Sequence, residues 1–318
     1  MNVLVTGADG FAGRNLVRRL AGAGHAVAAG CRPGGPPLDA WLGAPPGRER
    51  VSIVPLELED EGSVRSAAAR PLDAVVHLAA ISSGSAARRD PAGAWTVNAV
   101  GTVRLLHALA ARREQGLADP LVLVVSTGEV YGGGAAHPRR ETEPVAPLSP
   151  YAASKAAAEL AAFETWRRAG LRAIIARSFQ HIGPGQGPPF VVPAWIARLR
   201  EARRQGGGRV ATGNLDPVRD LLDVRDVVDA YVALLERGAP GEVYNVASGV
   251  GVRLGDLFRR LAELLGVDAT PEPDPALVRP ADLPHLVGDA TKLRRATGWA
   301  PRYTLDETLR GVVDAQAD

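Results

Sequence analysis

Residues 3–13 read Val3-Leu-Val-Thr-Gly7-Ala-Asp-Gly10-Phe-Ala-Gly13, an apolar run followed by three evenly spaced glycines. The following Asn15-Leu-Val-Arg-Arg-Leu20 has the apolar spacing of a helix. A buried strand, a glycine turn and a helix in this order are typical of dinucleotide binding, because the glycines let the backbone approach a pyrophosphate at the helix N-terminus. The spacing differs from the commoner Gly-x-Gly-x-x-Gly, so for this loop alone an ordinary glycine-rich turn is the alternative.

Strand-like apolar runs alternate with amphipathic segments along most of the chain. The expected strands cover residues 2–6, 26–30, 51–56, 74–78, 121–126, 172–178 and 242–247. The expected helices between them lie near residues 11–22, 61–70, 91–113 and 151–169. This alternation predicts an α/β fold of the Rossmann type, in which helices cover both faces of a parallel sheet.

The pattern changes after residue 178, where a turn-rich loop at 182–189 replaces the next strand-and-helix unit. Further helices are expected at 193–204 and at 224–235, the latter capped by Asp223, and Asp289 should cap a short helix before Gly298. We therefore expect a dinucleotide-binding domain over residues 1–178, to which 215–248 return. Residues 179–214 and 249–318 should form most of a smaller, discontinuous substrate lobe at the C-terminal side, over the carboxyl ends of the strands.

Lys155 is one of only two lysines among the 37 basic residues, and it lies four residues after Tyr151. On a helix this spacing places both side chains on one face. An ammonium beside a phenol favours the phenolate and lowers the tyrosine pKa from its ordinary value near 10, which the rigid fork of Arg does not reproduce. The pair therefore predicts a general acid and base that works near neutral pH, whereas an isolated Tyr-x-x-x-Lys is usually a surface pair.

The expected strand at 121–126 runs into Ser126-Thr127-Gly128-Glu129. A hydroxyl at the carboxyl end of a central strand can hydrogen-bond a substrate oxygen beside a cofactor. Thr127 with Tyr151 and Lys155 supplies the three groups needed for carbonyl reduction or alcohol oxidation. Alternatively, Thr127 is an ordinary strand-end threonine, and the hydroxyl of Ser126 is a possible substitute.

The composition limits the partners and the compartment. The chain has 318 residues, 46% hydrophobic and 23% charged, and a formal charge of +2, which predicts an ordinary globular protein without strong attraction to nucleic acid or membranes. No apolar run approaches the roughly 20 residues of a membrane span, and no signal-peptide pattern precedes the first strand. The single cysteine, Cys31, fits a reducing cytoplasm. We expect no metal site.

Several ordered motifs resemble the extended short-chain dehydrogenase/reductases that act on nucleotide sugars, over nearly the full length. The matching segments are residues 6–13, 75–80, 98–102, 127–132, 151–155, 177–185, 219–226 and 242–246. Within this family, Gly213-Asn-Leu-Asp-Pro-Val-Arg-Asp220 and Arg279-Pro-Ala-Asp-Leu-Pro284 look most like GDP-4-keto-6-deoxymannose reductases, followed by GDP-mannose 4,6-dehydratases.

The resemblance implies a role for each matching position. Tyr151 would protonate the sugar C4 oxygen during reduction, assisted by Lys155 and Thr127. Cofactor contacts are implied for Gly7, Gly10, Phe11, Ala12, Gly13, Glu57, Leu58, Leu78, Ala79, Ala80, Asn98, Tyr151, Lys155 and Phe179. Substrate contacts are implied for Ser82, Ser83, Glu129, Gln180, Arg219, Arg279 and Asp282. Two arginine forks in one cleft suit a diphosphate, although a lone arginine is more often a solvated surface charge.

Three positions depart from the family pattern. Relatives usually carry Asn where Gln180 stands, and many carry Pro at Ser178. Glucose-type dehydratases place an acidic Asp at the position of Gly128, which has no side chain to donate a proton. Glu129 still matches the dehydratase base, and GDP-mannose dehydratases also lack that Asp, so dehydration remains open.

Three functions are therefore considered. The leading one is NADPH-dependent reduction of a nucleotide-linked 4-keto-6-deoxyhexose, with a GDP-linked substrate. The second is a 4,6-dehydratase or 4-epimerase that returns its hydride to the same sugar. The third is a cofactor-binding protein without turnover, against which the intact trio of Thr127, Tyr151 and Lys155 argues.

The cofactor and the oligomeric state also have sequence signals. Arg32 follows the second strand, with no acidic residue before Asp39 to bind a ribose diol, so NADP(H) is expected to be preferred over NAD(H). Alternatively, Arg32 is a solvated loop residue. Relatives usually pair as homodimers through the helices near 91–113 and 151–169. The apolar positions of the first are Val97, Val103, Leu106 and Leu109, which could equally face the sheet.

Overall fold

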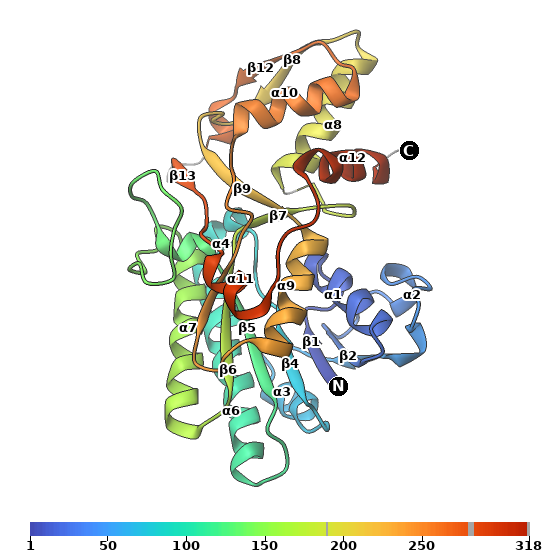
Figure 1. Ribbon diagram of the computed structural model, residues 1–318. Helices are drawn as coiled ribbons and strands as arrows, with labels where there is room; N and C mark the ends of the chain where they lie inside the picture. The colour runs from blue at the N-terminus through green and yellow to red at the C-terminus, as the bar shows by residue number, and fades with distance from the viewer. Residues whose placement is uncertain (189, 279–282, 317–318) are drawn as a thin grey trace.

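Two lobes make up the computed structural model, a larger lobe around a central sheet and a smaller lobe at one end of it (Figure 1). The structure describes residues 1–188, 190–278 and 283–316. The amino terminus lies in the large lobe, and the last helix belongs to the small lobe. Among the described helices, none is long and apolar enough to cross a bilayer.

Seven parallel strands form the central sheet in the order β10-β6-β5-β4-β1-β2-β3. They are β1 (Asn2–Thr6), β2 (Ala26–Cys31), β3 (Val51–Pro55), β4 (Ala74–His77), β5 (Leu121–Thr127), β6 (Ala173–Ser178) and β10 (Val243–Val246). Every strand end lies within one residue of the end expected from the sequence. The order, in which β1 and β4 are neighbours, confirms the Rossmann-type α/β prediction.

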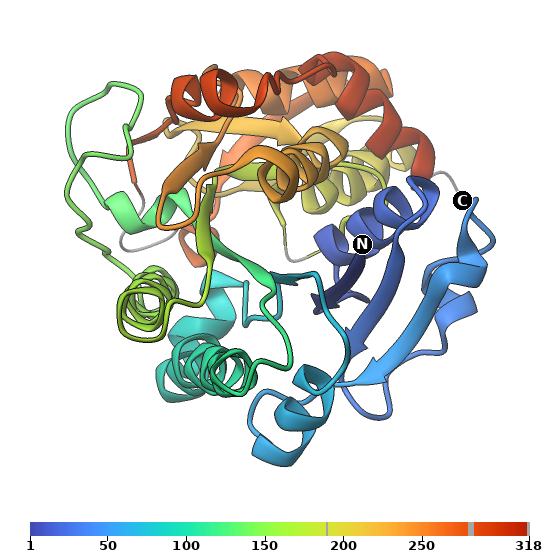
Figure 2. The same cartoon turned by 60° about the horizontal axis from the view of Figure 1, so that its bottom comes forward.

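Helices cover both faces of this sheet (Figure 2). The first face carries α1 (Phe11–Gly22), α9 (Val224–Arg237) and α11 (Thr291–Thr297), and the second carries α3 (Glu61–Ala68), α6 (Gly101–Glu114) and α7 (Pro150–Ala169). Val3 and Val5 are buried in the first core and Leu4 in the second, as the alternation of side chains along a strand requires. Burial of each such side chain contributes about 1.5–3 kcal/mol, so both cores stabilise the sheet.

The expected helix near 91–113 is divided into three parts. They are α5 (Pro91–Trp95), η2 (Thr96–Val100), which has the wider turn of a π-helix, and α6. Such wide turns are frequent at functional sites, and here the turn carries the buried Asn98. The remaining short helices of the large lobe are α2 (Leu38–Trp41), η1 (Arg48–Arg50), α4 (Gly84–Arg89) and η3 (Gly128–Tyr131).

The small lobe has its own sheets and core. Its strands are β7 (Gln180–Ile182), β9 (Val218–Asp223), β11 (Gly251–Arg253) and β13 (His285–Leu286) in one sheet, and β8 (Gly208–Thr212) and β12 (Ala269–Pro273) in another. Its helices are α8 (Val191–Arg204), α10 (Leu254–Leu265), η4 (Pro275–Leu277) and α12 (Leu305–Ala315). The Trp195 and Phe258 rings pack edge to face in the core between α8 and α10, with their centroids 5.5 Å apart.

The lobe boundaries differ in two places from those expected. The return to the large lobe begins at Val224 rather than at residue 215, because β9 pairs with β7, β11 and β13 instead of joining the central sheet. The segment after β13 also crosses back, since Leu293 of α11 and the nearby Trp299 are buried in the core of the large lobe. The small lobe is thus attached to the large one at several points.

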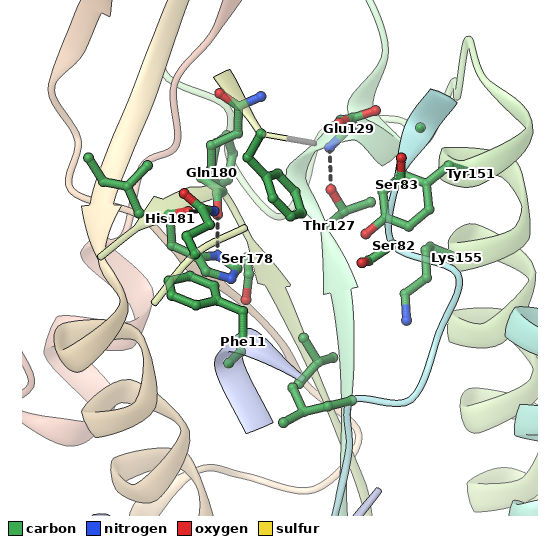
Figure 3. A pocket seen from close by; sticks show the side chains of 18 of the residues that line it. Phe11, Ser82, Ser83, Thr127, Glu129, Tyr151, Lys155, Ser178, Gln180 and His181 are labelled. Atoms are coloured by element: carbon green, nitrogen blue, oxygen red, sulfur yellow. Dashed lines mark hydrogen bonds between the residues drawn. The ribbon is translucent and has the colours of Figure 1, made fainter. Parts of the chain in front are cut away.

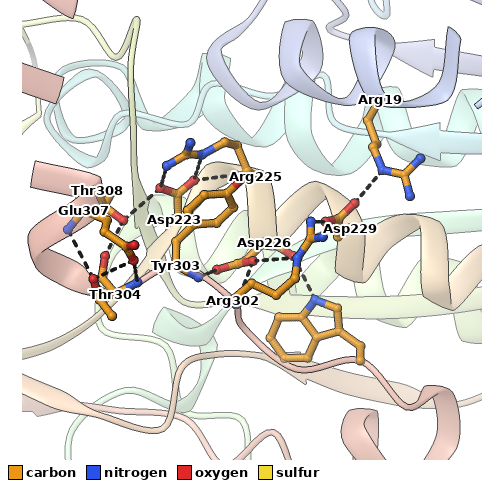
Figure 4. Close-up of polar contacts among 11 residues, drawn as sticks. Arg19, Asp223, Arg225, Asp226, Asp229, Arg302, Tyr303, Thr304, Glu307 and Thr308 are labelled. Carbon is orange, nitrogen blue, oxygen red and sulfur yellow. Dashed lines mark hydrogen bonds and ion pairs between the residues drawn. The ribbon is translucent and has the colours of Figure 1, made fainter. Parts of the chain in front are cut away.

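Two buried carboxylates join the lobes where α9 begins (Figure 4). Asp223 caps α9 by accepting the Arg225 N–H at 2.8 Å, as expected, and it also accepts the Thr308 hydroxyl of α12 at 2.8 Å. Asp226 accepts the backbone N–H groups of Arg302 and Tyr303, each at 3.0 Å. Because these acceptors are almost completely buried, the contacts fix the end of the small lobe against α9.

Candidate active site

The glycine turn after β1 leaves the N-terminus of α1 open to a ligand. Gly7 adopts a left-handed conformation with φ of +65°, and a Cβ there would lie 2.9 Å from Cα of Ala79. A Cβ on Gly13 would lie 2.1 Å from the Gly7 carbonyl oxygen. Gly10 is the N-cap and has no side chain to bond the first N–H groups of the helix. This turn therefore fits a pyrophosphate, which needs a close backbone approach and free N–H donors.

A cavity of about 260 Å³ opens beside this turn, between the lobes (Figure 3). Its walls come from the carboxyl ends of β4, β5 and β6, from α7 and from the segment that begins at β7. The residues expected from the sequence that line it are Phe11, Ala12, Leu78, Ser82, Ser83, Thr127, Glu129, Tyr151, Lys155, Phe179 and Gln180. The structure thus brings the three predicted catalytic side chains together at the place where a parallel sheet binds its ligands.

Thr127 is oriented as a hydrogen-bond donor. Its hydroxyl oxygen accepts the backbone N–H of Glu129 at 3.2 Å, where η3 begins, which leaves the hydroxyl hydrogen for another partner. Ser126, the alternative considered from the sequence, is committed elsewhere, because its hydroxyl donates to the carboxylate of Glu159 at 2.5 Å. Thr127 is therefore the strand-end hydroxyl available to Tyr151 and to a substrate oxygen.

Tyr151 is a neutral phenol in this structure. Burial is the largest effect and raises its pKa, the charge of Glu129 raises the pKa further, and the hydrogen bond with Thr127 only partly offsets them. The expectation that Lys155 would lower the pKa of Tyr151 below its ordinary value is therefore wrong for the protein without ligands, because desolvation of the phenol is the dominant effect. A protonated phenol is the form that can donate a proton to a developing alkoxide.

Lys155 lies one helical turn after Tyr151 and is nearly buried. Burial lowers the pKa of its ammonium to about 8, while the negative charge of Glu159 raises it. Glu159 continues the same face of α7 at a spacing of four residues, and its carboxylate also binds the Arg177 guanidinium at 2.8 Å. In the order Tyr151, Lys155 and Glu159, an acid, a cation and an anion therefore follow one another along one helix.

Asn98 lies behind the cavity wall and connects two of its parts. Its side-chain oxygen accepts the N–H of Ile81 at 2.7 Å, and its amide nitrogen donates to the Ser154 hydroxyl at 2.9 Å. Ser154 in turn donates to the backbone carbonyl of Tyr151 at 2.8 Å. Asn98 thus fixes the loop after β4, which presents Ser82, against the turn of α7 that carries the phenol.

Phe179 is enclosed by two glycines. A Cβ on Gly128 would lie 2.8 Å from one edge of its ring, and a Cβ on Gly288 would lie 2.5 Å from the opposite edge. These distances are far below the contact of about 3.5–4.0 Å that carbon atoms prefer. An Asp at position 128 is therefore incompatible with the present position of the Phe179 ring, which gives the absence of an acid there a structural cause.

A second cleft of about 220 Å³ adjoins the first, and Gln180, Phe190 and Val191 line both. Arg219 lines this cleft, and its guanidinium also donates to the Leu283 carbonyl at 2.6 Å. Arg198 of α8 is a second arginine in the lining. The sequence analysis did not select it, since one arginine on a helix that carries several has no distinguishing signal. The other two residues expected here, Arg279 and Asp282, lie outside the described residues.

The residues expected at the adenosine end of the cofactor lie along the same edge of the sheet. Arg32 is exposed directly after β2, and Glu57 and Leu58 follow β3, the next strand outward. Leu58 itself is buried, and a Cβ on Gly101 would lie 2.8 Å from its Cβ. Ala80 is half-buried just after β4. This edge therefore leads from the glycine turn toward Arg32 and Glu57.

Further polar residues line the cavity that the sequence analysis did not assign to it. They are Ser85, Arg88, Ser178, His181, Gln186 and Tyr231. Ser178 was noted only as a departure from the family pattern, and Tyr231 had no local signal because it lies on α9, far away in sequence. In the described part of the chain, no group of three or more His, Cys, Asp or Glu side chains is placed to hold a metal ion.

Known proteins resemble this chain along its length. A family model described as GDP-mannose 4,6-dehydratase matches residues 4–312. GDP-6-deoxy-D-mannose reductase of Pseudomonas aeruginosa is 39% identical over 246 residues, which cover 76% of this chain and 79% of the relative. UDP-glucose 4-epimerase of Mycolicibacterium smegmatis is 33% identical and covers 99% of this chain, with 98% of the relative covered.

Solved structures agree with this relationship. RMD of Pseudomonas aeruginosa complexed with NADPH superimposes with a TM-score of 0.81 at 33% identity, and the match covers 99% of this chain and 98% of the other. UDP-glucose 4-epimerase of Thermotoga maritima with UDP-glucose superimposes with a TM-score of 0.87 at 29% identity, with the same coverage of both chains.

Proposed function

The chain belongs to the GDP-mannose 4,6-dehydratase family of extended short-chain dehydrogenase/reductases, and from this premise we propose that it reduces the C4 keto group of a nucleotide-linked 4-keto-6-deoxyhexose with NADPH. The proposed substrate is GDP-4-keto-6-deoxymannose. The observation that carries the proposal is that Thr127, Tyr151 and the nearly buried Lys155 line one cavity. Burial raises the pKa of Tyr151, which favours the phenol as the proton donor. The 39% identity to a GDP-6-deoxy-D-mannose reductase supports the choice of reaction and nucleotide.

Each catalytic side chain has a defined part in this reduction. The Thr127 hydroxyl and the Tyr151 phenol hold the C4 oxygen, and Tyr151 gives its proton to that oxygen as the C–O bond becomes single. Bound NADPH supplies the hydride that adds to C4. The Lys155 ammonium stabilises the phenolate left on Tyr151 until a proton returns from solvent.

We propose that NADP(H) is preferred and that NAD(H) is also accepted. The glycine turn at the start of α1 is assigned to the pyrophosphate, and Lys155 and Tyr151 to the nicotinamide ribose. Arg32, which has no acidic neighbour before Asp39, is assigned to the 2′-phosphate. The NADPH complex of the Pseudomonas aeruginosa relative supports this preference, and an NAD complex of a related Thermus thermophilus epimerase supports the secondary use of NAD.

The second cleft is assigned to the nucleotide of the substrate. Arg219 and Arg198 bring two guanidinium groups to it, which suits a diphosphate because each fork can bind phosphate oxygens in pairs. Gln180 lines both spaces and is assigned to the junction of diphosphate and hexose. Arg279 and Asp282 remain proposed contacts of the nucleotide on the family resemblance, and Ser82, Ser83 and Glu129 of the hexose.

Dehydration is the alternative reaction, because Glu129 lines the cavity at the position of a dehydratase base. Elimination of water also needs an acid, and the packing of Phe179 against Gly128 leaves no room for one at that position. A 4-epimerase, like a dehydratase, returns its hydride to the same sugar. Net consumption of NADPH therefore separates the proposed reductase from both alternatives.

We also propose a homodimer in the cytoplasm. Trp95 is 44% exposed, Val103 50% and Leu160 71%, although all three are large apolar residues on α5, α6 and α7. Leu106 and Leu109, in contrast, are buried toward the sheet and do not contribute. Pairing of these helices with those of a second copy would cover the exposed side chains. Sedimentation of Leu160→Glu protein should then give a monomer, and a monomeric wild-type chain at all concentrations contradicts the dimer.

The test of the reaction is incubation with NADPH and GDP-4-keto-6-deoxymannose, alongside a dTDP-linked 4-keto-6-deoxy sugar. We expect one NADPH to be oxidised for each GDP-6-deoxyhexose formed, with the dTDP sugar a poorer substrate. GDP-mannose incubated with NADP⁺ provides the second arm. Formation of the 4-keto sugar there without net change in NADPH would establish a dehydratase instead, and no turnover in either arm would leave a 4-epimerase or a binding protein.

A further inference from the structure

Two buried hydroxyls on the cavity wall, those of Ser178 and Tyr231, have not been given a role. Ser178 is the last residue of β6 and is 6% exposed, and Tyr231 lies on α9 and is fully buried. Their oxygen atoms are 2.7 Å apart, and both residues line the catalytic cavity.

One of the two hydroxyl hydrogens of this pair is not used in their mutual hydrogen bond. Each hydroxyl carries one hydrogen, and their mutual hydrogen bond uses only one of the two. Within residues 1–188, 190–278 and 283–316, neither side chain has another hydrogen-bond partner. Burial raises the pKa of Tyr231, so its phenol stays protonated near neutral pH. One O–H donor is therefore left at the cavity wall, and a buried donor needs an acceptor.

The position of the pair indicates which group would supply that acceptor. Tyr231 comes from the face of the sheet that carries α1, whereas Tyr151 comes from the opposite face, and the two phenols are close enough for ionised Tyr231 to oppose ionisation of Tyr151. Val125 and Ser126, near the end of β5, line the same cavity. A nicotinamide whose ribose Tyr151 and Lys155 held would occupy the same cavity that Ser178 and Tyr231 line.

We propose that the Ser178–Tyr231 pair is a binding subsite that donates one hydrogen bond to a neutral acceptor oxygen of the bound reactants. This inference rests on the proposed function, which supplies two such oxygens, the carboxamide oxygen of the nicotinamide and an oxygen of the hexose. The hydroxyl pair would thereby fix the angle between the nicotinamide and the sugar. Pro at position 178 would remove one of the two hydroxyls.

The test compares wild-type protein with Ser178→Ala, Tyr231→Phe and the double variant. Tyr244→Phe is the matched control, because Tyr244 is also buried and its oxygen accepts the Ala239 N–H at 3.1 Å, away from the lining of the cavity. NADPH binding is measured by fluorescence titration and compared with the thionicotinamide analogue, whose sulfur is a weak acceptor. Thermal melting verifies that each variant is folded.

If the acceptor is the carboxamide, the double variant should bind NADPH about three- to tenfold more weakly, the effect of one net hydrogen bond. The wild-type protein should lose a similar factor on changing to the thio analogue, whereas the double variant should bind both cofactors equally. If the acceptor is on the sugar, the double variant should bind NADPH as the wild type does. The wild-type KM should then be about three- to tenfold higher for the 2-deoxy or 3-deoxy form than for the substrate, and the double variant should lose this difference.

The proposal would be overturned if the double variant bound NADPH and the thio analogue more weakly by the same factor, and if the KM ratio between the substrate and its deoxy forms were unchanged. The pair would then be merely structural. The same titrations separate this result from failure of the proposed function. Wild-type protein that binds no NADPH would refute the cofactor assignment and the subsite together. Wild-type protein that binds NADPH without reducing the 4-keto sugar would refute the reductase. The comparison of NADPH with its thio analogue would still test whether the carboxamide is the acceptor.

Discussion

The two walls of the catalytic cavity are built in different ways. On the large lobe, Thr127 ends the long strand β5, and Tyr151 and Lys155 lie on the twenty-residue helix α7. On the small lobe, Gln180 begins a strand of only three residues, and Arg219 lies on β9 between short strands. Long regular elements therefore hold the three groups to which the reaction is assigned, whereas shorter strands hold Gln180 and Arg219, two of the groups assigned to the substrate.

This difference suggests that chemistry and specificity are separable in this fold. The reacting side chains are fixed by bonds within the large lobe, such as those of Asn98 and Glu159, and none of these depends on the small lobe. The substrate wall can then vary in sequence while the reaction type is kept. Substitutions on the two walls should accordingly affect different kinetic constants.

The largest effect is expected on the large-lobe wall, from Tyr151→Phe. The substitution removes the proton donor and leaves the ring packing unchanged, and because a general acid contributes typically about 10²–10⁴-fold, kcat should fall by that factor. The dissociation constant of NADPH should change little. Steady-state reduction of the 4-keto sugar and a cofactor titration measure the two quantities. Turnover near that of the wild type in folded protein would exclude Tyr151 as the acid.

Thr127 provides a graded comparison on the same wall. Thr127→Ser keeps the hydroxyl and should retain more activity than Thr127→Val, which keeps only the shape of the side chain. Ser126 cannot compensate, because its hydroxyl is bonded to Glu159.

Arg219→Met is the corresponding test on the small-lobe wall. Loss of a charged hydrogen bond to a diphosphate should raise KM for the nucleotide sugar about 10- to 100-fold, with kcat and NADPH binding little changed. Arg209→Met is the matched control, since Arg209 is an exposed arginine of the same lobe that pairs with Glu272 at 2.9 Å. A fall in kcat equal to the rise in KM would show that the two walls are not separable.

The Arg32→Ala substitution tests whether the exposure of a residue, rather than the lobe it belongs to, decides whether binding or turnover changes. It belongs to the large lobe but lies on an exposed segment after β2. Arg32→Ala should weaken NADPH binding by about tenfold through loss of one charged contact and leave NADH binding unchanged. Titration of both cofactors measures the ratio. Equal affinities in the wild-type protein, unaffected by the substitution, would remove the assignment of Arg32 to the 2′-phosphate.

The sequence indicates the regular elements of the large lobe far better than the packing and desolvation around them. The central strands were predictable because buried parallel strands are continuous apolar runs, and Tyr151 and Lys155 because helical spacing places them on one face. The packing of Phe179 between Gly128 and Gly288 was not predictable, since it joins three distant segments. The neutral state of Tyr151 was missed because desolvation depends on the finished cavity rather than on the neighbouring residue.

Glu159→Gln gives the smallest expected change in activity and tests how the large-lobe wall sets the charge of Lys155. The Lys155 pKa is about 8, so the ammonium loses its proton as the pH rises through that value. Glu159 raises this pKa, so its removal should lower it, and the basic limb of the kcat/KM profile should move to lower pH. At pH 8 we expect a loss of less than about tenfold, the effect of a pKa change of one unit.

The Glu159→Gln protein also leaves the Arg177 guanidinium buried without its partner, which destabilises a fold by about 3–5 kcal/mol. The double variant Glu159→Gln/Arg177→Met removes both charges and is the control for folding. Because the net charge near Lys155 then changes less, its basic limb should lie closer to that of the wild type than the limb of the single variant. If both variants keep the basic limb of the wild-type kcat/KM profile while their melting temperatures differ, Glu159 stabilises the fold without setting the charge of Lys155. The large-lobe wall would then position Lys155 without tuning its pKa.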